Sequence, residues 1–319
     1  MHDCSAGNSP AARPHKSLTR PYVPVTDYIS HPVDGDTLEG PGSQRQREKP
    51  GAGTVALVAG VLIAAYSSSV VAQSPPDDPC GGRLALLAIL DRPTVGDSAC
   101  VVPDKHVVLE LGAQHATNRD GSHGFNLPEA EIRVGIPGDN ELVLLPPNYT
   151  WQSGAGPARS GPGAAVVGIK HELGYNANWL GAVESLVTLP TGNADFGSAG
   201  TGVAFNGIVS YSPTSNTGLS MMLGVSSQTL SPNAGGGRYA SVNPDFVATW
   251  APADKWQIYA EAYGQSSTGP NQGMGWNADG GVQYLLTPDV EIDTEIGFRL
   301  SGNLGGFRNY VGIGVGLKY

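Results

Sequence analysis

Two short segments of the sequence resemble catalytic motifs. Residues 171–175 (HELGY) begin like the His-Glu-x-x-His helix of zinc proteases, but Tyr175 stands where the second histidine must be. Residues 96–100 (GDSAC) begin like a nucleophile elbow but lack its final glycine, and no parallel sheet is predicted to support one. We therefore expect no enzymatic activity, no catalytic residues, no metal site and no cofactor.

A third pattern is formed by Gly312, Gly314 and Gly316, which match a dinucleotide-binding motif only loosely. The three glycines alternate with apolar residues on a predicted strand and do not open a helix. Small residues on one face of a strand leave room for side chains from elsewhere in the molecule. We expect such side chains to fill the space beside this strand.

Charged residues at every second position are the more informative pattern. In the segment 290–300, Glu291, Asp293 and Glu295 alternate with apolar residues, as expected for a strand whose two faces meet different solvents. A charge facing lipid at mid-depth costs about 2–4 kcal/mol, so these carboxylates are assigned to a polar interior. The same reasoning gives a set of lumen residues for a solute pathway: Glu110, Glu131, Arg133, Lys170, Glu172, Glu184, Tyr259, Glu261, Glu291, Asp293, Glu295 and Arg299.

For any one of these residues, a structural ion pair inside the barrel is the favoured alternative to a direct role. As a set, they contain more acidic than basic residues. Their acidic excess predicts a preference for cations over anions.

The last segment of the chain, 307–319, defines the class of protein. It alternates without interruption between apolar residues and small or polar residues, and it ends on Tyr319. A terminal strand of this form resembles the signal by which bacterial outer-membrane barrels are recognised for insertion. We therefore interpret Tyr319 as an assembly signal.

Upstream of this segment, alternating stretches of about ten residues are separated by turn residues. We expect twelve strands, at 107–115, 129–136, 141–151, 164–175, 179–189, 203–211, 219–227, 244–250, 256–265, 277–286, 290–300 and 307–319. Every second connection is tight, and those between are mostly longer and rich in glycine, as in outer-membrane barrels. An even number of strands places both ends of the barrel on the periplasmic side. The expected fold is an all-β, transmembrane, antiparallel up-and-down barrel of the Gram-negative outer-membrane type.

Aromatic residues flank the short turns. Tyr175, Trp179, Tyr211, Trp250 and Trp256 all lie beside these connections, where an interfacial aromatic girdle is expected. Turn-flanking core aromatics of a soluble sandwich are the alternative interpretation.

The composition agrees with a barrel. There are 45 glycines, and only 14% of the residues are charged, which argues against a charged helical protein. A barrel hides its lipid-facing residues at alternate positions, so a mean hydropathy near neutral, here −0.14, is expected.

The amino-terminal 72 residues form a separate region. Residues 1 to about 50 are polar and carry no apolar period, whereas residues 45–72 read as a signal peptide with a basic start, the apolar run 54–66 and cleavage after Ala72. The polar stretch before it is either an unusual extension or the result of a start codon placed too early, and we favour the second. A single membrane anchor is the weaker alternative for residues 54–71.

The charge of the exported part limits its partners. Residues 1–72 hold equal numbers of basic and acidic residues, so the net charge of −10 lies in the remainder. Without a basic patch to neutralise phosphates, nucleic acid is excluded as a partner.

Residues 73–104 form a periplasmic segment before the barrel, which itself spans 105–319. In an oxidising compartment Cys80 and Cys100 are expected to pair, although two reduced thiols are the alternative. They bracket the apolar run 84–90, for which we predict a short helix that plugs or caps the barrel.

Several short motifs resemble one known family. Residues 284–293 (YLLTPDVEID), 188–192 (TLPTG), 259–264 (YAEAYG) and 92–94 (RPT) before 98–100 (SAC) are similar to outer-membrane transporters grouped with the meta-pathway of phenol degradation. The resemblance spans about residues 92–319. It implies a secreted barrel with a transport role, often for aromatic or other hydrophobic compounds, and it brings no catalytic residues.

The expected function is passive uptake or export of small solutes through an outer-membrane channel. A barrel that hydrolyses lipids and a non-conducting structural or adhesive barrel are the alternatives. His171 is the only mid-strand candidate for a lipase histidine, and it has no evident serine partner. The expected partners are outer-membrane lipid, the barrel assembly machinery and a small-molecule solute; the sequence predicts no oligomeric state.

Overall fold

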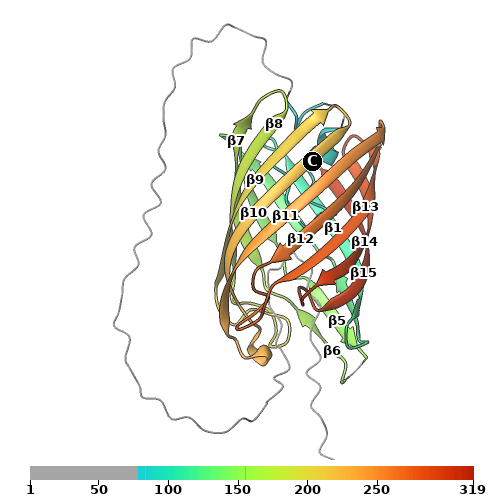
Figure 1. The fold of residues 1–319 in the computed structure, drawn as a ribbon. Helices are drawn as coiled ribbons and strands as arrows, with labels where there is room; N and C mark the ends of the chain where they lie inside the picture. The colour runs from blue at the N-terminus through green and yellow to red at the C-terminus, as the bar shows by residue number, and fades with distance from the viewer. Residues whose placement is uncertain (1–77, 83, 155) are drawn as a thin grey trace, which may run out of the picture. The chain divides into compact units, whose positions relative to one another are not determined.

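The computed structural model describes residues 78–319 apart from residues 83 and 155. It is a closed antiparallel β-barrel (Figure 1). The predicted signal peptide and the extension before it lie outside the described residues. Among the described residues, no helix is both long and apolar enough to serve as a membrane span.

Twelve strands form the wall of the barrel, as the sequence predicts. Each strand pairs with its neighbours in antiparallel register, and the first pairs with the last, so the wall has no open edge along the seam. The twelve strands are β1 (Val107–Asn118), β3 (Glu131–Ile136), β4 (Asn140–Leu145), β7 (Val166–Tyr175), β8 (Trp179–Thr188), β9 (Gly202–Thr214), β10 (Thr217–Thr229), β11 (Arg238–Ala253), β12 (Trp256–Gln265), β13 (Gly275–Thr287), β14 (Val290–Ser301) and β15 (Phe307–Lys318).

The seam between β1 and β15 is closed by the carboxy-terminal residue. Tyr319 and Val107 exchange both backbone hydrogen bonds, at 2.9 and 3.1 Å. Tight turns connect the strands at this end, which the sequence analysis assigns to the periplasm, and the longer connections lie at the opposite end (Figure 1).

Three neighbouring strands of the wall differ from the prediction. The short strands β2 (His123–Leu127), β5 (Tyr149–Ser153) and β6 (Arg159–Pro162) pair with one another and continue the lines of β3, β4 and β7 after an interruption. Pro128 and the pair Pro146-Pro147 lie at two of these interruptions, where proline offers no N–H to the ladder. The predicted strand 141–151 is therefore two strands, and the predicted loops 116–128 and 152–163 contain β2 and β6.

The free edge of β6 is covered by the connection between β8 and β9. Asn193 bonds to the carbonyl oxygens of Pro162 and Ser160, and the side chains of Arg159 and Asp195 form an ion pair at 3.1 Å. These contacts provide hydrogen-bond partners for part of the unpaired backbone at the edge that the interruption creates.

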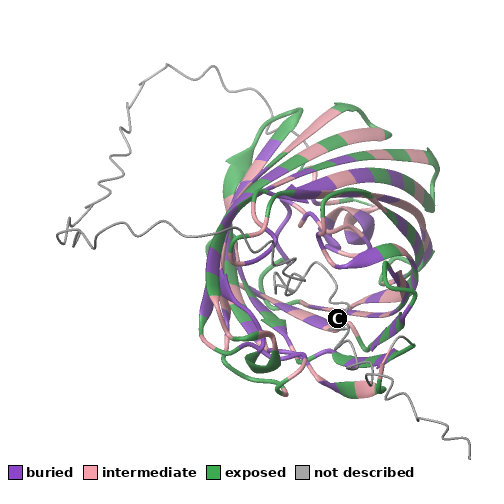
Figure 2. Ribbon diagram, turned by 60° about the horizontal axis from the view of Figure 1, so that its bottom comes forward, coloured by how far each residue is buried: buried purple, intermediate pink, exposed green. Residues whose placement is uncertain are grey.

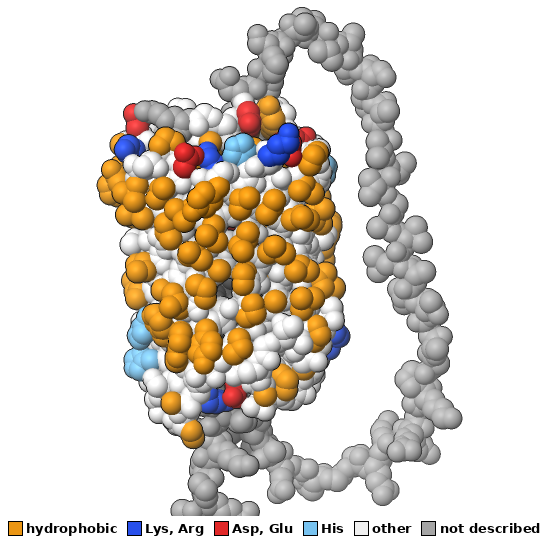
Figure 3. Space-filling model, turned by 180° about the vertical axis from the view of Figure 1, so that it is seen from behind, with side chains coloured by type: hydrophobic (Ala, Val, Ile, Leu, Met, Phe, Trp, Pro, Cys, Tyr) orange, Lys and Arg blue, Asp and Glu red, His pale blue; other side chains and the backbone are white. Residues whose placement is uncertain are grey.

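The two faces of the wall meet different surroundings. Outward residues such as Phe205 and Val225 are each 51% exposed, whereas the inward neighbours Ala204 and Ser226 are buried. Apolar side chains cover the middle of the outer surface, and charged ones gather near its two ends (Figure 3). Aromatic pairs stand beside the short turns, with 4.5 Å between ring centroids for Trp179–Tyr211 and for Trp256–Tyr284. This is the arrangement of a membrane-spanning barrel with an aromatic girdle.

The segment before β1 folds inside the barrel. It contains the helix α1 (Ala85–Ile89), and Figure 2 shows a short helix within the ring of strands. Leu86 and Ile89 are buried against inward-facing apolar residues of the wall, among them Val108, Ile208 and Met222. The expected polar interior is therefore interrupted by an apolar surface in the part of the lumen that receives α1. There, the wall must offer an apolar surface to the helix.

The lipid-facing assignment predicts the effect of a charge at Leu223, which lies in the middle of β10 and is 50% exposed. Leu223→Arg should lower the free energy of unfolding in a lipid bilayer by about 2–4 kcal/mol, because the guanidinium enters hydrocarbon. Urea unfolding in vesicles measures this change. Leu223→Ala is the control for lost apolar area, and equal losses for both variants would contradict the assignment.

Candidate functional site

The candidate site is the lumen where it meets the plug, which we define as residues 78–104. Backbone N–H groups of the plug donate to carboxylates that project inward from the wall. Glu110 on β1 accepts from Asp91 and Arg92, at 3.2 and 2.6 Å. Two other wall carboxylates hold the plug in the same way: Glu261 on β12 accepts from the N–H groups of residues 95 and 96, and Glu141 on β4 accepts from that of residue 102.

Arg92 of the plug places its positive charge against carboxylates of β14 and of the connection between β2 and β3. Its guanidinium lies 3.2 Å from Asp293, 3.3 Å from Glu129 and 3.8 Å from Glu295. The space for it exists because β1 and β15 carry glycines at this level. A Cβ atom on Gly112 would lie 2.3 Å from the guanidinium, and one on Gly314 would lie 2.4 Å from it. The sequence-based expectation concerned Gly312, Gly314 and Gly316, and it is confirmed: they leave room for the side chains of Glu295, Arg92 and Leu90, respectively.

On the opposite side, Asp91 joins the plug to two buried cations. Its carboxylate lies 3.2 Å from Arg133 and 3.0 Å from Lys170, and both cations also pair with Glu141. Burial raises the pKa of the Asp91 carboxyl from 3.8 to about 6, since the loss of water outweighs the favourable charges of Arg133 and Lys170. The guanidinium of Arg133 and the ammonium of Lys170 favour the ionised carboxylate, which pairs with both of them.

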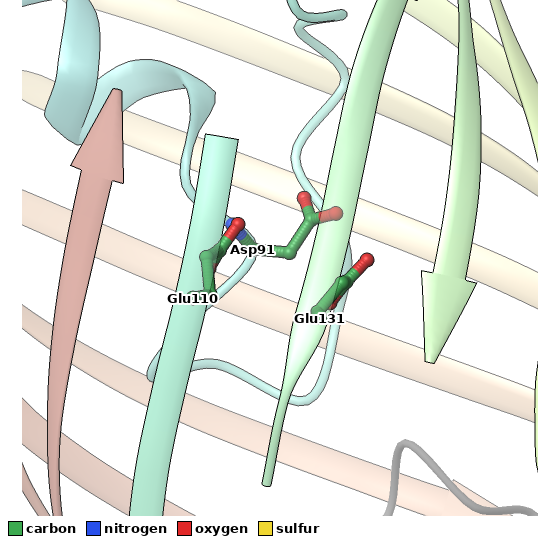
Figure 4. Close-up of side chains that lie close together, drawn as sticks. All are labelled: Asp91, Glu110 and Glu131. Atoms are coloured by element: carbon green, nitrogen blue, oxygen red, sulfur yellow. The ribbon is translucent and has the colours of Figure 1, made fainter. Parts of the chain in front are cut away.

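Asp91, Glu110 and Glu131 form a compact acidic group around this point (Figure 4). One oxygen from each lies within 4.8 Å of the others. Arg133 is 3.2 Å from Asp91 and 3.3 Å from Glu110, so two of the three carboxylates already have a counter-charge. Ion pairs with Arg133 therefore account for Asp91 and Glu110, whereas Glu131 forms no ion pair with the described residues.

A cavity of about 700 Å³ lies between the plug and the wall formed by β8–β12. One side is apolar and is formed by Leu84, Leu87 and Leu90 of the plug. The other side is formed mainly by hydroxyl and amide side chains of the wall, such as Ser210 and Gln257. The cavity therefore has an amphipathic lining next to a segment that crosses the lumen.

A family model described as "Putative MetA-pathway of phenol degradation" matches residues 90–311, which is more than half of the chain. The chain belongs to this family. The match begins at residue 90, directly after α1, and runs into β15, so it covers most of the barrel and the second half of the plug. Comparison with the curated proteins finds no match.

The first of three similar solved structures supports the fold. The barrel is similar to the COG4313 outer membrane channel from Pseudomonas putida F1, with a TM-score of 0.55 and 11% identity over 69% of this chain and 98% of that one. The NanC porin has a TM-score of 0.47 and 12% identity over 67% of this chain and 100% of its own. The KdgM porin has a TM-score of 0.46 and 9% identity over 66% and 99%. At these identities the likeness concerns the fold alone.

The remaining lumen residues predicted from the sequence lie at different depths in the barrel. Glu184 and Glu291 are buried in the lumen, and Asn206 donates to Glu184 at 2.8 Å. Tyr259 is buried, and its hydroxyl donates to the carbonyl oxygen of Pro93 in the plug at 3.5 Å. Two residues lie nearer the rims and are only half buried: Glu172, and Arg299, which donates to the carbonyl oxygen of Gly302.

A disulfide joins Cys80 and Cys100 across α1, with 5.6 Å between the Cα atoms. A bond closing a loop of this size contributes about 3 kcal/mol by restricting the unfolded chain. It ties the two ends of the plug helix segment together before the chain enters β1.

Sequence reasoning missed several lumen residues of equal importance. Asp91 and Arg92 lie in the plug, which has no periodicity to reveal them. Glu141 begins a strand whose two faces are both apolar, so its direction was ambiguous. Asp245 and Asp279 follow the inward phase of β11 and β13, and the same alternation that identified Glu261 would have found them.

His171, the residue considered for a lipase, lies on the outward face of β7. It is exposed, and its Nδ1 contacts Asn140 at 3.0 Å. Within the described part of the chain, no serine forms a hydrogen bond with His171.

The Arg92 contacts predict how the plug responds to mutation. Arg92→Ala should weaken plug docking by about 3–5 kcal/mol, because it leaves Asp293 and Glu129 buried without their cation. Single-channel conductance in planar bilayers should rise several-fold. Arg92→Lys is the control that keeps the charge, and we expect it to fall between wild type and Arg92→Ala. Wild-type conductance of Arg92→Ala would contradict this role.

Proposed function

We propose that this chain is an outer-membrane channel through which small solutes pass down their concentration gradients. The observation that carries the proposal is the plug. This segment crosses the lumen and is attached to the wall by hydrogen bonds and ion pairs rather than by an uninterrupted apolar core. Such contacts exchange with water more readily than a packed core, because water replaces hydrogen bonds but not apolar contacts. The channel and porins with similar folds support the same class of function.

The charge of the lumen supports a preference for cations. The buried charged residues of the described chain are eleven acidic residues against two basic ones. Cations are concentrated in such an interior, and anions are repelled. The family adds aromatic or other hydrophobic compounds as the candidate solutes, and the amphipathic cavity beside α1 suits a molecule with one apolar face.

Export to the periplasm by the signal peptide of residues 45–72 and insertion by the barrel assembly machinery through Tyr319 belong to this proposal. Lipid then surrounds the outward face. A non-conducting structural barrel is the second candidate, and the observation that favours it is the same plug, which fills part of the lumen.

Removal of the plug distinguishes the two candidates. Deletion of residues 73–100 takes away Arg92, Asp91 and α1, so a transport barrel should conduct several-fold more ions in planar bilayers. Ala substitution at the exposed residue His106, which lies between the plug and β1, is the control for changes outside the lumen. A barrel that conducts no ions either with or without the plug would support the structural role.

The solute class is tested by uptake into proteoliposomes. We expect phenols or fatty acids to enter faster than sugars of similar size, because the cavity has an apolar side formed by α1. Liposomes without protein give the background of direct permeation. Faster entry of sugars than of phenols would contradict a hydrophobic or aromatic solute.

A further inference from the structure

Two histidines and two arginines gather on the outer surface of the barrel, at the end of the longer connections. His115 lies on β1, His123 on β2, Arg119 in the turn between these strands and Arg308 near the start of β15. All four side chains are exposed. We call these residues the basic cluster.

Strand pairing brings the members of the cluster together. The rings of His115 and His123 are stacked across β1 and β2, with 5.5 Å between their centroids. Arg119 is tied to the connection before β15, because its backbone N–H donates to the carbonyl oxygen of Gly306 at 3.3 Å and its guanidinium donates to Asn303 at 3.2 Å.

A break in register directs Arg308 outward. Thr117 lies opposite Asn309, whereas the next residue of β1 lies opposite Phe307, so Arg308 is an extra residue on β15 at this point. Phe307 and Tyr310 on either side are buried in the barrel. Arg308 is exposed, and it therefore shares the outer face with the two histidines.

The basic cluster has no counter-charge. Within the described chain, none of its four members forms an ion pair. The acidic residue of the same turn, Asp120, accepts instead from the N–H and the hydroxyl of Ser122, at 2.9 and 2.7 Å. Unpaired basic groups stand out in a protein with a net charge of −10, and they favour an anion from outside the chain.

The cluster lies at the border of the apolar outer surface. His115 stands opposite Val311 on one side and opposite Phe125 on the other, and both of these apolar residues face outward. Phe125 is followed by Trp151 and Tyr149, with 5.8 and 4.5 Å between successive ring centroids. Histidine side chains lie below the apolar band in Figure 3, toward the longer connections. Aromatic residues of this kind mark the boundary between hydrocarbon and water, so the cluster lies at the level of lipid head groups.

The chemistry of the cluster suits a phosphate group. A guanidinium offers parallel N–H donors that match phosphate oxygens, and an imidazole has at least one N–H donor in either protonation state. Basic residues at a membrane surface attract anionic head groups. The apolar residues next to the cluster would at the same time contact acyl chains, which a free anion does not have.

We propose that the basic cluster binds the phosphate group of an outer-leaflet lipid, whose acyl chains lie against the apolar surface beside Phe125 and Val311. The leaflet follows from the assignment of the tight turns to the periplasm. Lipid binding on the outer surface does not require conduction, so this proposal and the proposed channel can fail separately.

The test is native mass spectrometry of the mature protein in detergent micelles with lipid A, a lipid that carries two phosphates on a glucosamine disaccharide. Lipid A without its phosphates is the matched probe for charge, and inorganic phosphate, added as a competitor, is the matched probe for acyl chains. We expect lipid A to bind at least ten times more tightly than its dephosphorylated form. Arg119→Gln and Arg308→Gln, each alone, should weaken its binding about fivefold. Arg308→Lys, which keeps the charge, should lose less than Arg308→Gln.

Arg238→Gln is the matched control. It removes the same charge from an exposed arginine at the same end of the barrel, but Arg238 already donates to the carbonyl oxygen of Thr201 and to the hydroxyl of Ser227, so wild-type binding is expected. The heat-dependent mobility of the folded barrel verifies that each variant is native.

Four results would each overturn the proposal: equal binding of the two forms of lipid A, wild-type affinity in both glutamine variants of the cluster, an equal loss in Arg238→Gln, or displacement of lipid A by equimolar inorganic phosphate. Selective binding of lipid A by a barrel that conducts nothing even after plug deletion would leave the lipid site standing and remove the channel.

Discussion

The exclusion of charge from hydrocarbon determines how the rest of this molecule is built. Each strand of the wall has one face toward lipid, so nearly every charged side chain of a spanning segment must point into the lumen. Because most of these residues are acidic, their carboxylates would repel one another if the lumen contained no plug. The plug offsets part of this repulsion by inserting Arg92 and a row of backbone N–H groups among the carboxylates.

This constraint explains why the plug and the seam of the barrel depend on each other. Gly112 on β1 and Gly314 on β15 form the slot for the Arg92 guanidinium, and β15 also carries the alternating apolar residues and Tyr319. One strand thus closes the barrel, faces lipid and receives the plug. A larger residue at Gly314 would remain compatible with the lipid face but would displace Arg92 from Asp293.

The alternation of residues was sufficient to predict twelve strands, the tight turns at one end of the barrel and the inward direction of Glu110, Glu261 and Asp293, because a period of two has only two phases. It failed at the interruptions near Pro128 and Pro146, where pairing continues across a break that looks like a loop. The alternation also does not indicate which distant parts of the chain contact each other. The contact of Arg92 with Asp293 joins residues 201 positions apart, and nothing in local periodicity encodes it.

Buried charge in this lumen is therefore of two kinds with different consequences. Where Arg133, Lys170 and Arg92 meet carboxylates, positive and negative groups balance and hold the plug, so these residues act mainly in structure. Where Asp245, Glu261 and Asp279 meet, no cation of the described chain balances them, although three adjacent strands keep them in place. A barrel selected only for stability would gain by replacing such residues with amides or apolar side chains. In this structure the three carboxyls lie within hydrogen-bonding reach of one another, and Glu261 and Asp279 also accept from the plug backbone and from the hydroxyl of Tyr310, so hydrogen bonds hold this group where ion pairs hold the other.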